Sequence, residues 1–350
     1  MNLTTLIERV RDLLGCPEIE FDQHVQSLWS GYGQIVKLVN PTSKQRYIVK
    51  WIAPDGANDH PRGWDGAVGH ARKVTSYQVE SHFYQYYSPH TDSYCQVAKL
   101  HAHDVCGRTR LIIMDDLDAA EFSTRLTETS WNQLKITLRW LAYFHGCFMN
   151  TDASGLWPTG TYWHLATRQD EWQSMPDSLY KRHAADIDKV LSDTKFPTLV
   201  HGDSKLANFC YHTNGKDVAA VDFQYVGRGC GVKDLAYLVG SALREDELAV
   251  YGDRILNEYI HQLKLAVKHY NVNLDIDELE QEVRFLYPIA WADFYRFLIG
   301  WNPQSWKICG FMEHMSKVGL SRVVKLTQAL DCFLPKADIT EPSTTNKPPQ

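Results

Sequence analysis

Two stretches of sequence decide the fold: LVHGDSKLAN at Leu199–Asn208 and VDFQ at Val221–Gln224. In both, a short apolar run precedes polar side chains, which is typical of polar groups at the end of a strand or a strand-like turn. A packed scaffold can hold side chains rigidly at such positions. Asp203, Asn208 and Asp222 are therefore the first candidates for chemistry.

The residue types and their spacing suit phosphoryl transfer. That reaction needs one acid or base to orient the attacking hydroxyl, metal ligands that bridge the phosphates, and fixed positive charge. Asp203 is the candidate base, and Asn208 and Asp222 are candidate ligands because Mg²⁺ prefers oxygen donors and keeps several waters. The Asp-x4-Asn spacing matches the kinase catalytic loop, and Asp222 falls where the Asp of Asp-Phe-Gly would fall. An isolated His-Gly-Asp is usually a plain turn, so the prediction depends on all three residues in this order.

With these motifs the chain resembles the aminoglycoside phosphotransferase and choline kinase superfamily, and most closely its ecdysteroid-kinase-like small-molecule kinases. That group carries His-Gly-Asp, then Asn, then Asp-Phe-Gln, and then a Gly-containing turn before Asp-Leu, matched here by GCGVKDL at Gly229–Leu235. Gln224 stands where protein kinases have Gly and indicates this branch. The resemblance covers about residues 25–330. It implies an ATP- and Mg²⁺-dependent enzyme that moves the γ-phosphoryl group to a hydroxyl of a small molecule.

A chain of 350 residues suits one large or two medium domains. We expect an α+β, bilobed protein-kinase-like fold. Its N-lobe, residues 1–115, would be a small antiparallel sheet with a helix that covers the nucleotide. Its larger, mainly helical C-lobe, residues 116–335, would hold the catalytic loop and the acceptor site. The tail at 336–350 contains Pro, Thr and Ser and is expected to be disordered.

The composition excludes several other classes. Lys and Arg total 36 against 42 Asp and Glu, a formal net charge of -6 without a long basic run, which argues against a nucleic-acid partner. The 8 cysteines form no Cys-x-x-Cys pair, and we expect reduced thiols. The N-terminus lacks the apolar core of a signal peptide, and no apolar run approaches membrane-spanning length. We expect a cytoplasmic protein without a membrane partner, and the composition indicates no oligomeric state.

The N-terminal part predicts a helix at 3–14 and then two strand-like runs within 28–39. Gly31 and Gly33 lie in the turn between these runs. In a kinase this hairpin would cover the nucleotide, and the glycines would let backbone amides approach its phosphates. The same turn is also an ordinary hairpin turn, and it lacks the third glycine of Gly-x-Gly-x-x-Gly.

A third strand at 45–51 places Lys50 where the kinase strand lysine contacts the α- and β-phosphates. The alternative is a surface lysine on a strand edge. The helical pattern at 73–87 carries Glu80, which we predict as the partner of Lys50. Between them, 53–66 is dense in Pro, Gly and Asp and predicts a loop, either a flap that involves Arg62 and His70 or simply an exposed segment.

The last two strands of the first lobe are predicted at 94–100 and 109–117. Backbone groups of Asp115 to Leu117 would then contact the adenine edge, a role that needs no particular side chain. Met114 before them is either a gatekeeper-like residue or part of the core.

The helical lobe begins at the capping box formed by Ser130 and Gln133. Asp234 is expected as the N-cap of a later helix or, as in kinases, as an anchor beneath the catalytic loop. Further helices are predicted at 245–270 and 277–300. The second of these leads to the candidate acceptor-binding side chains, which are Asp293, Tyr295 and Trp301. They would suit an ammonium-bearing alcohol by charge and cation–π attraction, an apolar alcohol as a wall, or no ligand at all as core.

Two other functions compete with a small-molecule kinase. One is a kinase-like module that binds nucleotide without turnover, against which the intact Asp203, Asn208 and Asp222 argue. The other is a protein kinase, but the stretch between Asp222 and Asp234 is too short for a long activation segment. The acceptor class is open at this point and includes sterol-like alcohols, amino alcohols, sugars and antibiotics.

Overall fold

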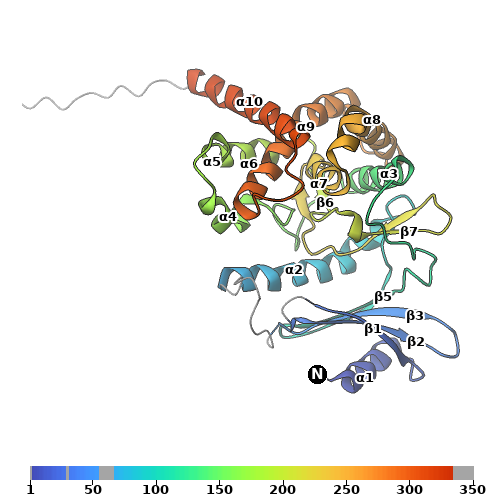
Figure 1. Ribbon diagram of the computed structural model, residues 1–350. Helices are drawn as coiled ribbons and strands as arrows, with labels where there is room; N and C mark the ends of the chain where they lie inside the picture. The colour runs from blue at the N-terminus through green and yellow to red at the C-terminus, as the bar shows by residue number, and fades with distance from the viewer. Residues whose placement is uncertain (1, 29–30, 55–66, 334–350) are drawn as a thin grey trace, which may run out of the picture.

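The computed structural model describes residues 2–28, 31–54 and 67–333 (Figure 1). It has a small lobe built around one sheet and a larger lobe built mainly of helices, and α2 lies between the sheet and the helical lobe. The predicted α+β, bilobed fold is confirmed. Most of the loop predicted at 53–66, Arg62 included, and the tail predicted at 336–350 lie outside the described residues.

The small lobe contains a five-stranded antiparallel sheet of order β1-β2-β3-β5-β4. Its strands are β1 (Glu20–Ser27), β2 (Gly33–Val39), β3 (Arg46–Ile52), β4 (Leu100–Cys106) and β5 (Thr109–Asp115).

Helices cover both faces of this sheet. The predicted helix α1 (Leu3–Leu14) packs Leu6 and Val10 on one face. Helix α2 (Ala67–Tyr86) lies on the other face and packs Tyr77 and Phe83 into the core shared with the large lobe. Because α2 contacts both the sheet and the second lobe, its side chains can reach groups of either lobe.

Two strand predictions were wrong in position. The segment at 94–100 is not a strand, because the Asp92 side chain accepts a hydrogen bond from the amide of Tyr94 and forms a turn; β4 begins only at Leu100. The first strand of the hairpin ends at Ser27 instead of beginning at Leu28. Every residue of β1 is exposed, so this edge strand carries no apolar alternation from which it could be predicted.

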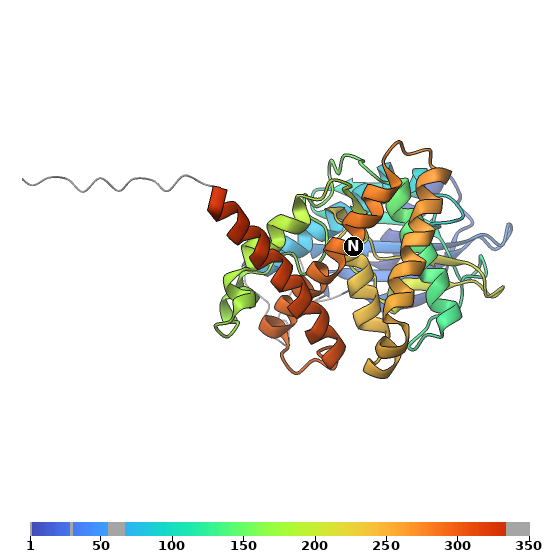
Figure 2. The same ribbon diagram turned by 90° about the horizontal axis from the view of Figure 1, so that it is seen from above.

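The large lobe consists mainly of helices, which in the view from above lie over the sheet (Figure 2). They are α3 (Trp131–Cys147), α4 (Gln169–Ser174), α5 (Leu179–Arg182), α6 (Ala184–Ser192), α7 (Val232–Ala242), α8 (Glu245–His269), α9 (Ile276–Trp301) and α10 (Gly310–Phe333). The predicted capping box at the start of α3 is present, with the amide of Gln133 donating to the Ser130 hydroxyl and the amide of Ser130 donating to the Gln133 side chain. The helices predicted at 245–270 and 277–300 are confirmed as α8 and α9.

Two short antiparallel pairs of strands carry the loops that contain Asp203, Asn208 and Asp222. One joins β6 (Thr198–Val200) to β9 (Gly227–Gly229), and the other joins β7 (Phe209–Tyr211) to β8 (Val218–Ala220). Short 3-10 turns occur at η3 (Ser88–His90), η4 (Leu165–Thr167) and η5 (Leu206–Asn208). Within the part of the chain that the structure describes, no helix has both the length and the hydropathy to cross a bilayer.

Candidate active site

The candidate catalytic loop, which carries Asp203, leaves β6 at Val200 and turns sharply at Gly202. Gly202 has φ +81, and a Cβ at this position would lie 2.1 Å from the carbonyl oxygen of Tyr225. Only glycine fits this backbone conformation and this close approach. The backbone amides of His201 and Gly202 donate to the two carboxylate oxygens of Asp234, at 2.5 and 2.9 Å. The loop is therefore held in one conformation before Asp203 begins.

Asp234 anchors this loop from beneath. It lies in the first turn of α7, which begins at Val232, so the prediction that Asp234 is the N-cap was wrong. Its carboxylate also contacts His145 Nε2 at 3.1 Å, and His145 Nδ1 contacts the Tyr259 hydroxyl at 2.8 Å. Burial would raise the pKa of Asp234, but the hydrogen bond and charge of His145 lower it below its ordinary value. The carboxylate accepts from the loop amides in place of capping its own helix.

Asp203 is 6 % exposed, and both of its carboxylate oxygens are hydrogen-bonded. Oδ1 accepts from the Tyr237 hydroxyl at 3.0 Å. Oδ2 accepts from Lys205 Nζ at 2.8 Å and from Asn208 Nδ2 at 3.1 Å. Burial raises the pKa of Tyr237, so its hydroxyl stays protonated and donates to the carboxylate. These three donors fix the orientation of the Asp203 carboxylate. A fixed orientation is what a base needs if it is to accept a proton from one particular hydroxyl of a substrate.

Asp222 lies beside Asn208 because the two loops are joined through their backbones. The Val221 amide donates to the Asn208 carbonyl at 2.9 Å, and His201 Nε2 contacts the Val221 carbonyl at 3.0 Å. Asp222 adopts the left-handed conformation, with φ +68, which costs energy in a non-glycine residue and is typical of functional sites. Burial would raise the pKa of Asp222, but the ammonium groups of Lys50 and Lys73 lower it below its ordinary value.

Asn208 and Asp222 fit a Mg²⁺ site. Among the described residues, Oδ1 of Asp222 is buried without a hydrogen-bond partner. The side-chain nitrogen of Asn208 donates to Asp203, which leaves the amide oxygen as the group available for a cation. In the described part of the chain, no cluster of three or more His, Cys, Asp and Glu side chains could hold a metal ion. An ion held here would take its other oxygens from water and from nucleotide phosphates, as Mg²⁺ commonly does.

The predicted pair of Lys50 and Glu80 is present between β3 and α2. Lys50 Nζ lies 2.8 and 2.6 Å from the two Glu80 oxygens, and the two residues are 4 % and 1 % exposed. Burial raises the pKa of Glu80, and the Lys50 ammonium opposes that rise. Lys50 Nζ also lies 3.8 Å from Asp222 Oδ1, so the pair faces the candidate metal site.

The sequence analysis missed Lys73, which adds a partly buried cation near this pair. Lys73 precedes Glu80 by seven residues, about two helical turns, and so occupies the same face of α2. Its Nζ donates to Gln224 Oε1 at 2.7 Å and lies 4.8 Å from the centroid of the Tyr77 ring. Burial lowers the pKa of Lys73 to about 8. The spacing of seven residues was the signal in the sequence that could have identified this residue.

A cleft of about 410 Å³ lies between the lobes, and six of the predicted site residues line it: Lys50, Glu80, Asp115, Leu117, Asn208 and Asp222. Leu28, just after β1, and Ile35 in β2 add apolar walls. Met114, with 7 % exposure, belongs both to the core and to the lining. Gly31 and Gly33 lie outside this lining. Gly33 has a packing role, because a Cβ there would be 2.0 Å from the carbonyl oxygen of Trp51.

Lys37 is a further residue of the cleft that the sequence analysis missed. From β2 its Nζ contacts Asp116 at 3.0 Å and Asp118 at 2.7 Å, just after β5. The Lys37 contacts join the sheet to the segment that connects the lobes.

His70, which we predicted as a possible flap residue, contacts Tyr32 instead: its Nδ1 lies 2.7 Å from the Tyr32 hydroxyl.

The predicted acceptor residues on α9 do not meet at Asp203 as a set. Asp293 is 0 % exposed, with Oδ1 2.7 Å from Arg296 Nη2 and Oδ2 3.2 Å from Lys233 Nζ. Two buried cations neutralise it, so this carboxylate does not face a ligand as we expected. Tyr295 packs on the ring of Tyr180 at 4.9 Å, and Trp301 stacks on Phe297 at 5.4 Å. Helical spacing predicted the positions but not the direction in which each side chain points.

Comparisons with known proteins support the fold and the predicted resemblance. Residues 160–272, which include Asp203, Asn208 and Asp222, match the ecdysteroid kinase-like family. A solved structure from Ralstonia eutropha JMP134, named as a presumed aminoglycoside phosphotransferase, is similar, with a TM-score of 0.51 and 13% sequence identity. The match covers 93% of this chain and 98% of that protein's chain. No curated protein is significantly similar in sequence.

Two other solved structures are more distant. Aminoglycoside phosphotransferase APH(3'')-Id from Streptomyces rimosus, in complex with ADP and streptomycin, has 13% identity, a TM-score of 0.48, and coverage of 83% of this chain and 99% of its own. Plasmodium vivax ethanolamine kinase has 10% identity, a TM-score of 0.40, and coverage of 89% and 84%. The match over residues 160–272 confirms the predicted resemblance to the ecdysteroid-kinase-like family, and the Ralstonia eutropha structure supports the expected fold.

Proposed function

We propose that this chain, an ecdysteroid-kinase-like member of its superfamily, transfers the γ-phosphoryl group of ATP to a hydroxyl group of a small molecule with the help of Mg²⁺. One observation supports this most directly. Asp203 is held by the loop that Asp234 clamps, and Asn208 joins it to Asp222 at one end of the cleft between the lobes. A base, metal ligands and fixed cations in one place are the parts that phosphoryl transfer needs.

In this proposal Asp203 orients the acceptor hydroxyl and takes its proton. Asn208 and Asp222 would hold Mg²⁺, which supplies positive charge to the phosphates. Lys50, fixed by Glu80, neutralises the α- and β-phosphates. Because low-dielectric surroundings strengthen fixed charges, buried cations in this cleft stabilise the transition state more than surface cations would.

The nucleotide would lie between the sheet and the segment after β5. Leu28 and Ile35 provide an apolar surface for the base, and backbone groups from Asp115 to Leu117 would contact its polar edge. Gly31 and Gly33 remain predicted phosphate-loop residues through their backbone amides. Lys73 adds charge beside Asp222.

The two competing functions have less support. A binding module without turnover has no need of an Asp203 oriented by three separate donors. A protein kinase needs an activation segment, but the short stretch after Asp222 is occupied by β9, which pairs with β6. A small-molecule kinase accounts for both features.

The direct experiment is a screen of the full-length protein against hydroxylated small molecules, with ADP release measured in the presence of ATP and Mg²⁺. We expect release that depends on one class of alcohol and disappears when EDTA removes the metal. A Tm that rises with Mg-ATP, but without ADP release for any alcohol, would favour the binding module. Phosphate transferred to added proteins but to no small molecule would favour the protein kinase.

A further inference from the structure

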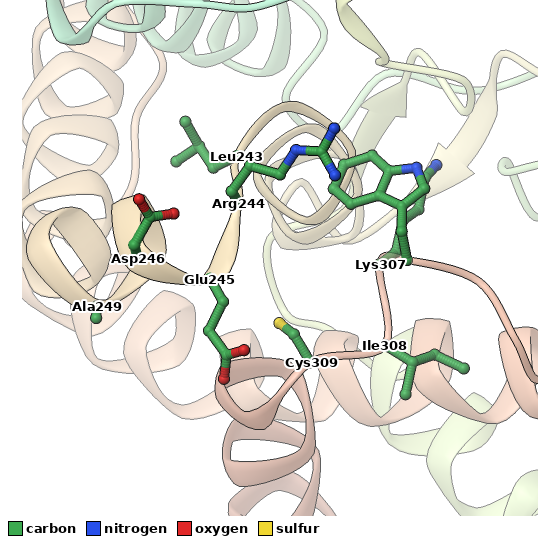
Figure 3. A pocket seen from close by; sticks show the side chains of 9 residues that line it. Leu243, Arg244, Glu245, Asp246, Ala249, Lys307, Ile308 and Cys309 are labelled. Carbon is green, nitrogen blue, oxygen red and sulfur yellow. The ribbon is translucent and has the colours of Figure 1, made fainter.

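A second pocket, of about 590 Å³, lies in the large lobe between the start of α8 and the segment that connects α9 to α10 (Figure 3). It shares no lining residue with the cleft between the lobes. Its lining is formed by Leu243, Arg244, Glu245, Asp246, Ala249, Trp306, Lys307, Ile308 and Cys309. The pocket therefore combines apolar, aromatic and charged side chains from two segments about sixty residues apart.

Lys307 links this pocket to the candidate base. Lys307 Nζ lies 5.0 Å from the centroid of the Tyr237 ring and 5.8 Å from that of Phe294. The hydroxyl of the same Tyr237 donates to Asp203 Oδ1 at 3.0 Å. One aromatic side chain thus separates the Lys307 ammonium from Asp203. A ligand group bound to Lys307 would therefore lie one aromatic ring away from the candidate base.

The Lys307 ammonium lacks a counter-charge in direct contact. Within the described part of the chain it forms no ion pair or hydrogen bond through Nζ and contacts only the faces of aromatic rings. Burial lowers the pKa of Lys307 to about 8, and the negative charge of Asp203 only partly opposes that change. A partly buried cation without a hydrogen-bonded partner is costly, so an oxyanion from a ligand would relieve an existing penalty.

The acidic side chains of the pocket do not fill this role. Arg244 extends over the Trp306 ring, and Figure 3 shows Asp246 pointing away from Lys307 and Glu245 lying on the side of Cys309. Glu245 accepts a hydrogen bond from the Gly310 amide at 2.9 Å. Both carboxylates lie in the exposed first turn of α8, where water and salt screen their charges. Of the charged side chains that line the pocket, Lys307 is therefore the partly buried one, whereas Arg244, Glu245 and Asp246 are exposed.

A cationic acceptor does not fit this arrangement. Asp293, the carboxylate expected to attract one, is neutralised inside the lobe by Lys233 and Arg296. Lys205 pairs with Asp203 at 2.8 Å, and Lys307 also interacts electrostatically with it. An ammonium group would be repelled by both lysines, whereas an oxyanion would be attracted.

We propose that this pocket binds the acceptor, and that the acceptor is an alcohol that also carries an oxyanion group, such as a carboxylate, which Lys307 binds. The inference rests on the proposed function. Leu243, Ile308 and the half-exposed ring of Trp306 would cover the apolar part of the molecule, and Arg244, 4.5 Å over that ring, would add a second positive charge. In the reaction, the acceptor oxygen bonds to the γ-phosphorus as the bond between γ-phosphorus and the ADP oxygen breaks. The hydroxyl proton passes to Asp203.

A matched set of ligands tests the charge preference by binding. Isothermal titration with the ADP-bound protein compares 4-(hydroxymethyl)benzoate, 4-(hydroxymethyl)benzamide and 4-(hydroxymethyl)benzylamine, which share a skeleton and differ in charge. We expect the benzoate to bind best. Lys307→Met should weaken benzoate binding by about 10- to 100-fold, the typical value of one hydrogen bond to a charged group, while Lys307→Arg retains most of it. The benzamide should respond little to either change.

Lys317→Met is the matched control, because Lys317 is an exposed lysine on α10. Equal binding of the three ligands, stronger binding of the benzylamine, or benzoate binding unchanged in a folded Lys307→Met protein would overturn the inference. Circular dichroism establishes whether that variant is folded, and Lys307→Gln replaces it if it is not.

Failure of the proposed function gives a different result. In that case no alcohol of any charge would release ADP, although the benzoate would still bind through Lys307.

Discussion

The side chain of Lys73 donates a 2.7 Å hydrogen bond to the side-chain oxygen of Gln224. Ser76, one turn further along α2, approaches the same oxygen at 3.3 Å. The ring of Phe223, between Asp222 and Gln224, stacks on Phe83 with the centroids 4.0 Å apart. The Asp-Phe-Gln segment is thus fastened to α2 at two points. A glycine at position 224 could not make the first of these contacts.

This relationship predicts a catalytic role for Lys73. Lys73→Met should lower kcat by about 100-fold, because a preorganised positive charge beside the candidate phosphate site is lost. Steady-state kinetics of the accepted alcohol, with Lys99→Met as an exposed control, measure the effect. A Lys73→Met enzyme with the parent kcat would show that the lysine only fastens the helix to Gln224.

Asp203→Asn should separate turnover from nucleotide binding. The amide keeps the size of the carboxylate but cannot accept the hydroxyl proton, so turnover should fall by ~10²–10⁴-fold. The rise in Tm with Mg-ATP should persist, because Asp203 does not line the nucleotide cleft. Near-normal turnover in this variant would remove Asp203 from its assigned role.

Asp222→Ala should abolish the part of nucleotide stabilisation that depends on the metal. Asn208 would remain as the other candidate ligand, and one neutral amide binds Mg²⁺ weakly. Thermal melts with ATP and either Mg²⁺ or EDTA measure this, since a ligand that binds the folded state raises Tm. Asp253→Ala, an exposed position on α8, is the control. If the Asp222 variant responds to Mg²⁺ as the parent does, the ion is held elsewhere.

The parts of the site that the sequence predicted are those encoded locally. Asp203 and Asn208 lie in one loop, and a few neighbouring residues determine their geometry. The pair of Lys50 and Glu80 was predictable because a strand and a helix each place one residue at a defined point of a known arrangement. Asp222 followed from its motif.

The parts that the sequence did not predict depend on long-range packing. Lys37 contacts Asp118 across 81 residues, and no local pattern marks either of them. The pocket beside Lys307 joins two segments that are distant in the chain. On α9 the sequence analysis recognised the spacing of the aromatic residues. Buried residues occupy several faces of this helix, so the spacing did not reveal that Asp293 points into the core.

Asp293 now gives a prediction about stability. Burial would raise the pKa of Asp293, but Lys233 and Arg296 lower it to about 2. Asp293→Asn leaves both cations buried without a counter-charge, which should lower the free energy of unfolding by about 3–5 kcal/mol. Urea unfolding at pH 7 measures the difference, and Asp253→Asn should stay within about 0.5 kcal/mol of the parent.

The dependence on pH gives this prediction a second test. The pKa of Asp293 in the folded protein is below its ordinary value of 3.8, so the charged carboxylate stabilises the fold at every pH above that value. This contribution is lost only as the pH falls from 3.8 through about 2. The difference in unfolding free energy between parent and Asp293→Asn should therefore be constant from about pH 8 to about pH 5 and should shrink only in stronger acid. A variant with the stability of the parent, but with weaker and salt-sensitive binding of an ammonium-bearing alcohol, would instead return Asp293 to the acceptor site.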